Sequence, residues 1–254
     1  MDKLWLRGGF PRSFVAADDE DSIRWRRDFI RTFVQRDLPQ FGVTVPSGTM
    51  SRFWSMLAHV HGQVWNASRM AANFGVAHTT VGRWLDTLTA TMVVRLLPPW
   101  TENLAKRQVK SPKIYLADTG LLHAFHDIAD AELLERHPAV GASWESFGLE
   151  TVVRRLGARR DQCYFWGTHQ GAELDLLVVA GGRRLGFEFK RNSAPTVTPS
   201  MRIAMKDLRL DGLDVVHAGN RRFDMADGIR AIPLSAVLDF VKPLSKPRAT
   251  GSRS

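Results

Sequence analysis

The stretch ELDLLVVAGGRRLGFEFK, residues 173–190, is the part of this 254-residue chain that decides how its fold is interpreted. Two runs rich in Leu, Val and Phe flank the pair Gly181-Gly182. A Gly-Gly pair between two strand-like runs is typical of a two-residue hairpin turn, because both central residues of such a turn need positive φ angles. The sequence therefore predicts an antiparallel hairpin in which Ala180 lies opposite Arg183.

This register places four charged side chains on one face of the hairpin. Asp175 then faces Glu188, and Glu173 faces Lys190, because residues two apart in a strand share a face. Directly opposed residues have Cβ atoms about 4.5–5.5 Å apart, so the carboxylates of Asp175 and Glu188 are expected to lie together. The other face is expected to be apolar, with Leu174, Leu176, Val178, Leu185, Phe187 and Phe189.

Two arrangements would offset the repulsion between these carboxylates. One is a divalent cation such as Mg²⁺ held between Asp175 and Glu188, with Lys190 beside it. Metal-dependent phosphodiester cleavage needs that arrangement, because the metal lowers the pKa of a bound water and a lysine stabilises developing charge. The other is a salt-bridge network with a nearby arginine or lysine, and the residues leave both arrangements open.

The pattern D…E-x-K on two antiparallel strands, preceded by a helix with a glutamate, is similar to the PD-(D/E)XK nuclease-like fold. This resemblance implies that Asp175 and Glu188 are metal ligands and that Lys190 is the catalytic lysine. It also implies that Glu145 is an accessory metal ligand, with Glu150 as the second choice. The expected elements have the same order as that fold: a helix over residues 144–156, strands near 164–166, 173–180 and 183–190, a helix over 199–210 and a strand near 214–218.

The middle of the chain has the pattern of a winged helix-turn-helix. A helix over residues 68–74 is followed by Gly75 and by a second helix over residues 79–88, whose apolar residues recur at i, i+3, i+4 and i+7. Strand-like runs follow at residues 92–97 and 113–118, and the loop between them is basic. A basic wing beside a recognition helix is how such domains hold phosphates, whereas the alternative is a helical hairpin that packs against protein. The expected DNA contacts are Thr79, Arg83, Lys106, Arg107 and Lys110.

The remaining segments lie before the helix-turn-helix pattern and at the C-terminal end of the chain. A helix is expected over residues 21–38, ending before Pro39, and another over residues 47–61 with Ser47 as its N-cap. Residues 242–254 contain four basic residues and no acid, which predicts a disordered basic tail. The predicted division is a helical lead-in (1–61), a winged-helix-like domain (62–138), a nuclease-like domain (139–241) and the tail (242–254).

Composition narrows the class of protein. Hydrophobic residues make up 44% and charged residues 24%, which is typical of a globular chain and excludes a disordered one. The net charge of +9 favours an anionic partner, most simply DNA, although charge that only aids solubility is the alternative. Cys163 is the single cysteine, so an internal disulfide and a zinc site with two thiolates are excluded. Without a spanning apolar stretch or a signal sequence, we expect a cytoplasmic protein that does not contact membrane.

Several short motifs, in their order, resemble one family. They are GGFP (8–11), RDLP (36–39), SPKIYLADTGLL (111–122), GASWE (141–145) and the hairpin. The resemblance covers roughly residues 8–240 and is to the uncharacterised C-terminal region of prokaryotic AAA-type ATP-binding proteins, a domain-of-unknown-function family. In that family a P-loop ATPase domain precedes this region, but the sequence has no G-x-x-x-x-G-K-[ST] motif. The ATPase domain is therefore lost, lies on a separate chain as a partner in trans, or is missing because the sequence is a fragment, and no ATP is expected on this chain.

The sequence thus predicts an α/β protein with a helical N-terminal part, a winged helix-turn-helix and a PD-(D/E)XK-like mixed sheet flanked by helices. The expected function is that of a DNA-associated protein with a Mg²⁺-dependent nuclease-like site. A non-catalytic binding or regulatory module that acts with an ATPase is the alternative. A structural oligomer whose basic face only aids solubility is a third interpretation, and the sequence does not determine the oligomeric state.

Overall fold

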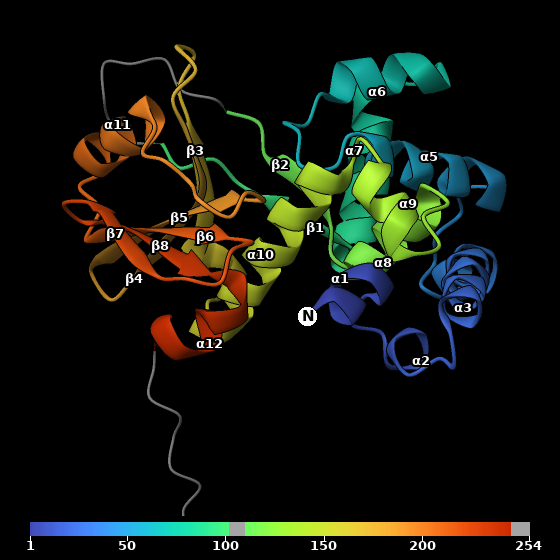
Figure 1. The fold of residues 1–254 in the computed structure, drawn as a ribbon. Coiled ribbons are helices and arrows are strands. Elements are labelled where there is room, and N and C mark those ends of the chain that lie inside the picture. The colour runs from blue at the N-terminus through green and yellow to red at the C-terminus, as the bar shows by residue number, and fades with distance from the viewer. Residues whose placement is uncertain (102–109, 245–254) are drawn as a thin grey trace, which may run out of the picture. The chain divides into compact units, whose positions relative to one another are not determined.

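The computed structural model describes residues 1–101 and 110–244, and the chain forms two compact units (Figure 1). Unit 1 consists of residues 1–99 and 110–147, and unit 2 consists of residues 100–109 and 148–254. The division falls inside helix α10 (Val140–Leu156), whose residues up to Phe147 belong to unit 1. Each unit is therefore built from two stretches of chain.

Unit 1 is mainly helical and carries one small antiparallel sheet, in which β1 (Val94–Leu97) pairs with β2 (Lys113–Leu116). The residues Gly62–Trp65 lie against β2 as a short third segment, because Gly62 N donates to Ile114 O and Trp65 N donates to Pro112 O, both at 2.7 Å. The helices are α1 (Asp2–Arg7), α2 (Pro11–Phe14), α3 (Asp19–Thr32), a π-helix (Phe33–Asp37), α4 (Leu38–Gln40), α5 (Ser47–His59), α6 (Ala67–Phe74), α7 (His78–Ala90), α8 (Thr119–Phe125) and α9 (Ala131–Arg136).

The predicted helix over residues 21–38 differs from the structure at both ends. Helix α3 begins at Asp19, where Asp18 caps it by accepting a hydrogen bond from Asp21 N. The chain then passes through the π-helix into α4, so the prediction that helical structure ends before Pro39 is wrong. Pro39 is tolerated because it lies in the first turn of α4, where its missing N–H is not needed.

The predicted helix over residues 47–61 is present as α5, with two corrections. Its N-cap is Pro46, and Ser47 is the first helical residue rather than the cap. The helix ends at His59 because the chain leaves it to join β2, and the buried Nδ1 of His61 accepts a hydrogen bond from Leu116 N. Helices are also present where residues 68–74 and 79–88 predicted them, as α6 and α7, with Gly75 between them at a φ of 63°.

A polar network joins the first residues of unit 1 to α8. Asp118 caps α8 through Leu121 N and also accepts a hydrogen bond from Gly9 N at 2.7 Å. At Gly120 the helix passes so close to α1 that an added Cβ atom would lie 2.2 Å from Arg7 O. Farther along the chain, Ser143 Oγ accepts a hydrogen bond from Trp5 Nε1 at 2.9 Å. The GGFP motif (8–11) and residues 117–120 (ADTG) therefore contact each other in the folded protein.

Unit 2 is a six-stranded mixed sheet in the order β3-β4-β5-β6-β8-β7. The three strands β5, β6 and β8 are parallel, and the other neighbours are antiparallel. Strands β4 and β5 have the predicted bounds, whereas β7 and β8 are strands that the sequence analysis did not predict. The strands are β3 (Cys163–Gly167), β4 (Glu173–Ala180), β5 (Arg183–Lys190), β6 (Gly212–His217), β7 (Phe223–Ala226) and β8 (Ile229–Pro233), and the helices of this unit are α11 (Pro199–Asp207), α12 (Val237–Phe240) and the 3₁₀ turns Arg160–Gln162 and Leu234–Ala236.

Helices cover both faces of this sheet. Met201 and Ala204 of α11 belong to the buried cluster that contains Leu177 and Leu213, so α11 covers the face on which those side chains lie. The second half of α10 covers the other face, because a Cβ atom at Gly148 would lie 2.5 Å from the Phe189 ring. This arrangement leaves the sheet between two helical layers.

The chain remains packed beyond the last helix. Leu244 N donates to Leu156 O at 2.9 Å, so the predicted disordered tail does not begin at residue 242. The rest of that predicted tail, residues 245–254, lies outside the described residues. Within the described ranges, none of the helices is both long enough and apolar enough to span a membrane.

Candidate functional site

The hairpin of β4 and β5 forms with the register that its sequence predicts. Gly181 and Gly182 adopt φ angles of 57° and 76°, the left-handed values that a two-residue turn of this type requires. Ala180 pairs with Arg183, and the same register continues to the pair of Leu176 and Phe187. The prediction of the turn is confirmed, and the predicted register is confirmed as far as this pair. The predicted pairs Asp175–Glu188 and Glu173–Lys190 lie beyond it and stay predictions.

A β-bulge alters the hairpin near its open end. Strand β4 shifts by one residue against β3 between the pairs Tyr164–Leu177 and Trp166–Leu174. As a result Leu174 lies with Leu177 in the cluster under α11, and a Cβ atom at Gly186 would be 3.5 Å from the Leu174 side chain. The prediction that Leu174 shares a face with Leu176 is therefore wrong, because a bulge breaks the strict alternation of a strand.

The two predicted carboxylates are brought together and are deeply buried. Asp175 and Glu188 are each 4% exposed. Asp175 Oδ2 accepts a hydrogen bond from Phe189 N at 3.0 Å, and Glu188 Oε2 lies 2.8 Å from Lys190 Nζ. Glu188 Oε1 is buried and has no hydrogen-bond partner. Burial, together with the neighbouring charge of Asp175, raises the pKa of the Glu188 carboxyl well above its ordinary value.

These residues fit a small divalent cation in part. A buried carboxylate oxygen without a partner is costly, and a bound cation would remove that cost. Magnesium in proteins is held by one or two carboxylates while water and substrate phosphates supply its other ligands. Among residues 1–101 and 110–244, no three His, Cys, Asp or Glu side chains form a group that could share a metal ion. Asp175 and Glu188 therefore match a site of the two-carboxylate kind.

The two predicted accessory glutamates, Glu145 and Glu150, belong to different units and have different partners. Glu145 belongs to unit 1, where its Oε1 accepts a hydrogen bond from Tyr115 Oη at 2.6 Å. Glu150 belongs to unit 2, on the half of α10 that covers the face of Phe189, and its carboxylate lies 3.8 Å from Arg154 Nε. The role of Glu145 as a metal ligand stays a prediction.

The predicted DNA contacts fall partly inside the described residues. Thr79 and Arg83 are exposed on α7, whose opposite face is buried, and Lys110 is exposed just before β2. Lys106 and Arg107 lie outside the described residues. The helix therefore exposes His78, Thr79, Arg83 and Asp86 to solvent.

Comparisons with known protein families show which family the chain belongs to. The profile described as domain of unknown function DUF8612 matches residues 1–132, which is more than half of the chain. The chain belongs to the DUF8612 family. A second profile, domain of unknown function DUF4143, matches residues 140–237 and so includes α10, the hairpin and the rest of the sheet up to β8. The candidate carboxylates Asp175 and Glu188 lie in the region that this second profile matches.

Two curated proteins are similar to the chain over most of its length. They are named "Uncharacterized protein Rv2008c" of Mycobacterium tuberculosis and "Uncharacterized protein Mb2031c" of Mycobacterium bovis. Each is 50% identical to this chain over 237 residues. Those residues are 93% of this chain and 53% of each relative, so the chain spans about half the length of the curated relatives it matches. No solved structure is significantly similar to it.

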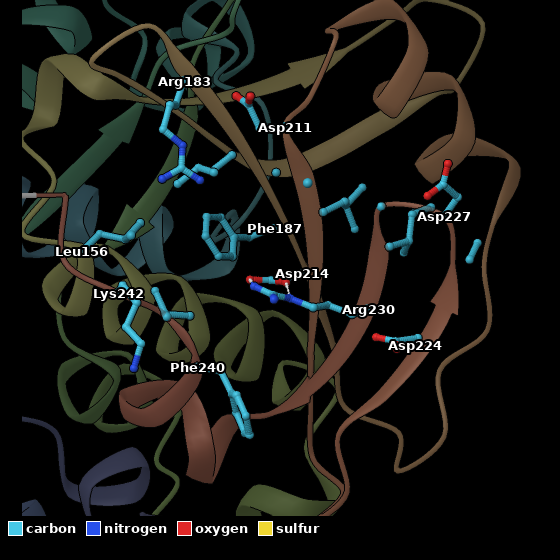
Figure 2. A pocket seen from close by; sticks show the side chains of 18 residues that line it. Leu156, Arg183, Phe187, Asp211, Asp214, Asp224, Asp227, Arg230, Phe240 and Lys242 are labelled. Carbon is cyan, nitrogen blue, oxygen red and sulfur yellow. Dashed lines mark hydrogen bonds and ion pairs between the residues drawn. The ribbon is translucent and has the colours of Figure 1, made fainter.

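Sequence reasoning missed a cavity in unit 2 of about 590 Å³, shown in Figure 2. Its floor includes the row Phe187, Asp214 and Arg230, which are aligned across β5, β6 and β8. The Arg230 guanidinium is bound side-on by the Asp214 carboxylate, which raises the pKa of Arg230. This row lies on the sheet face opposite the Glu188 side chain, and neither Glu188 nor Lys190 lines the cavity. No sequence signal could have found the cavity, because it depends on the pairing of β6 with the unpredicted β8.

Proposed function

We propose that this protein is a DNA-associated protein whose β4–β5 hairpin is a Mg²⁺-dependent nuclease-like site. The observation that carries the proposal is the buried pair of Asp175 and Glu188, with one Glu188 oxygen unpartnered and Lys190 2.8 Å from the other. A protein interior tolerates two adjacent carboxyls only when a proton or a cation compensates them. Lys190 offsets one of the two negative charges, and a divalent cation would offset the other and leave a net positive charge at the site.

The order of elements in unit 2 supports the proposal. Helix α10 is followed by the antiparallel strands β3, β4 and β5, then by α11, and then by β6 parallel to β5. This is the order of a PD-(D/E)XK nuclease-like core, with its acidic residues on the second and third strands. The fold alone does not establish activity, so the proposal depends on the side chains of the hairpin.

Each hairpin residue has a distinct part in the proposed chemistry. Asp175 and Glu188 would hold the metal, and the hydrogen bond from Phe189 N fixes the orientation of the Asp175 carboxylate. A Mg²⁺ ion held by these residues would supply a water of lowered pKa and would neutralise charge on the phosphate. Lys190 keeps its ammonium close to the carboxylates, and its side chain is 38% exposed, so it can also reach a phosphate from solvent.

The proposed contact with DNA is made by unit 1. Its helices α5, α6 and α7 and its strands β1 and β2 follow the order of a winged helix, and the residues Gly62–Trp65 supply the additional short strand. Thr79 and Arg83 would face the DNA, and the basic loop with Lys106, Arg107 and Lys110 would hold phosphates. An AAA-type ATPase is the proposed partner in trans, because a P-loop ATPase domain precedes this region in the family that the sequence resembles.

Cleavage assays test the nuclease proposal directly. Plasmid, linear duplex and branched DNA are incubated with Mg²⁺ or Mn²⁺ and the wild type, Asp175→Ala, Lys190→Ala or Glu173→Gln. The last variant is the matched control, because Glu173 is an exposed carboxylate on the same strand. We expect cutting that depends on metal, that Asp175→Ala and Lys190→Ala abolish, and that Glu173→Gln retains. Cutting that survives both alanine substitutions would show that the site is misplaced.

One observation favours a second candidate, a non-catalytic binding or regulatory module that acts with an ATPase. Asp175 and Glu188 are nearly inaccessible, and the Lys190 ion pair already satisfies half of the Glu188 carboxylate. In that case the hairpin is a structural element of the sheet. Absence of cleavage by a well-folded wild type that also fails to bind Mn²⁺ would favour this second function.

A further inference from the structure

A groove lies between α5 and α6 in unit 1, apart from the residues of the proposed DNA contact. It encloses about 470 Å³, within the usual range of ligand pockets. Its apolar surface comes from Met56 of α5, from Val60, Val64 and Trp65 in the connection and from Met70 of α6. We use the name α5–α6 groove for this surface.

The α5–α6 groove is preformed. The Gly62–Trp65 segment at its base is held against β2 by backbone hydrogen bonds of 2.7 Å from Gly62 N and from Trp65 N. At one end Arg52 Nη2 donates to Asn73 O at 3.1 Å, and the same guanidinium lies 4.9 Å from the centre of the Phe74 ring. A ligand would therefore lose little free energy to ordering of the groove itself.

The charges around this groove all have one sign. Arg52, Arg69 and His59 are its ionisable residues, and none of the described residues that line it is an Asp or a Glu. Val64, which also lines this groove, is 42% exposed. An apolar strip between basic edges is complementary to a helix with apolar residues on one face and acidic residues beside them.

Nucleic acid fits the groove less well, although it is also anionic. Single-stranded nucleic acid needs a series of exposed aromatic faces for its bases. This groove has one tryptophan, Trp65, which is half-buried and packs edge-on against Phe53, and its other apolar side chains are aliphatic or thioether. Methionine side chains such as Met56 and Met70 instead adapt to the varied apolar residues of a bound helix. The mainly aliphatic and thioether surface therefore favours an acidic helix over nucleic acid.

We infer that the α5–α6 groove is a docking site for an acidic amphipathic helix of a partner protein. This interaction is separate from the proposed DNA contacts, because Thr79 and Arg83 of α7 do not line the groove. It is also independent of the hairpin, which belongs to unit 2. The partner helix would place its apolar residues on Val60, Val64 and Met70 and its carboxylates near Arg52 and Arg69.

Two synthetic helical peptides test the inference with the full chain. The acidic probe has leucines at i, i+3, i+4 and i+7 flanked by glutamates, and the basic probe has lysines in place of the glutamates. Binding is measured by fluorescence anisotropy at physiological salt. The variants are Arg69→Glu and Val64→Asp in the groove, and Arg136→Glu as a control, because Arg136 is an exposed arginine of α9 outside the groove. Circular dichroism checks that each variant is folded.

We expect the wild type to bind the acidic probe and not the basic one. Arg69→Glu and Val64→Asp should each weaken the acidic probe by about tenfold or more, whereas Arg136→Glu should change its affinity by less than about twofold. Arg69→Glu should also gain affinity for the basic probe, which a loss of folding cannot produce. Equal binding of both probes, no binding of the acidic probe, or equal effects of Arg69→Glu and Arg136→Glu would overturn the inference. Displacement of the acidic probe by oligothymidine, with loss of oligothymidine binding in Arg69→Glu, would show that the groove binds nucleic acid instead.

Discussion

The substitution Glu188→Gln tests the electrostatics of the hairpin through the pH dependence of stability. Glu188 is 4% exposed, so its carboxyl is almost fully removed from water. Burial first, and the charge of Asp175 second, raise its pKa in the folded protein above the ordinary value of 4.5, while Lys190 opposes the shift. Between the ordinary and the raised pKa, the folded state therefore binds a proton that the unfolded state does not.

The sign and the size of the effect follow from this difference in bound protons. Because the folded state binds more protons, the free energy of unfolding falls as pH rises through this window, by about 1.4 kcal/mol for each pH unit. In Glu188→Gln the amide has nearly the same shape as the carboxyl and no proton to lose, so this contribution disappears. The wild type should therefore lose stability relative to Glu188→Gln as the pH increases from about 5 to about 7.

Urea denaturation at about pH 5, 6 and 7, followed by circular dichroism in the presence of EDTA, measures the difference. EDTA is needed because a bound cation would replace the proton and hide the effect. Asp175→Asn is the companion variant: it removes the like charge, so it should make the decline with pH smaller without abolishing it. Parallel pH profiles for the wild type and Glu188→Gln would refute the reasoning, because they would mean that Glu188 titrates as in the unfolded chain.

Three further predictions address other parts of the molecule. Mg²⁺ should raise the thermal midpoint of the wild type and release protons at neutral pH, since the cation displaces the proton of the carboxyl pair, and calorimetry of Asp175→Asn should show neither effect. Gly120→Ala should destabilise unit 1 by about 3 kcal/mol or more, because its Cβ atom would lie 2.2 Å from Arg7 O, whereas Gly141→Ala, with no neighbouring atom within 4 Å, should be neutral or stabilising in urea titrations. Arg83→Glu should weaken duplex DNA binding and reduce its dependence on salt, and an unchanged salt slope in gel-shift titrations would count against α7 as the DNA-facing helix.

The hairpin shows what local sequence can specify. Gly181 and Gly182 determine the turn type, and the turn determines the register as far as the pair of Leu176 and Phe187, next to which Asp175 and Glu188 lie. The bulge that moves Leu174 to the other face could not be predicted in this way, because it arises from the pairing of β4 with β3. Local patterns thus predict contacts between neighbouring elements and miss adjustments imposed by a third one.

Other errors have the same kind of cause. Pro39 is a sound stop signal for a regular helix, but the π-helix before it changes the hydrogen-bond spacing and lets helical structure continue through α4. The ion pair of Asp214 and Arg230 could not be predicted from the sequence, because residues that lie side by side on parallel strands have no fixed spacing along the chain. The accessory role predicted for Glu145 rests on a family resemblance, and the structure adds that its carboxylate accepts a hydrogen bond from Tyr115.

The contact between the start of the chain and α8 has a consequence for the order of folding during synthesis. Trp5 Nε1 donates to Ser143 Oγ across 138 residues, and Gly9 N donates to Asp118 across 109 residues. A ribosome releases residues 5–9 long before their partners exist, so unit 1 cannot close in the usual N-terminal-first manner. Trp100, whose N donates to Phe165 O in unit 2, must also be synthesised before the second stretch of unit 1 appears. Contacts of such long sequence separation make folding slow, so the nascent helices α1–α7 expose apolar surface to chaperones until α8 emerges.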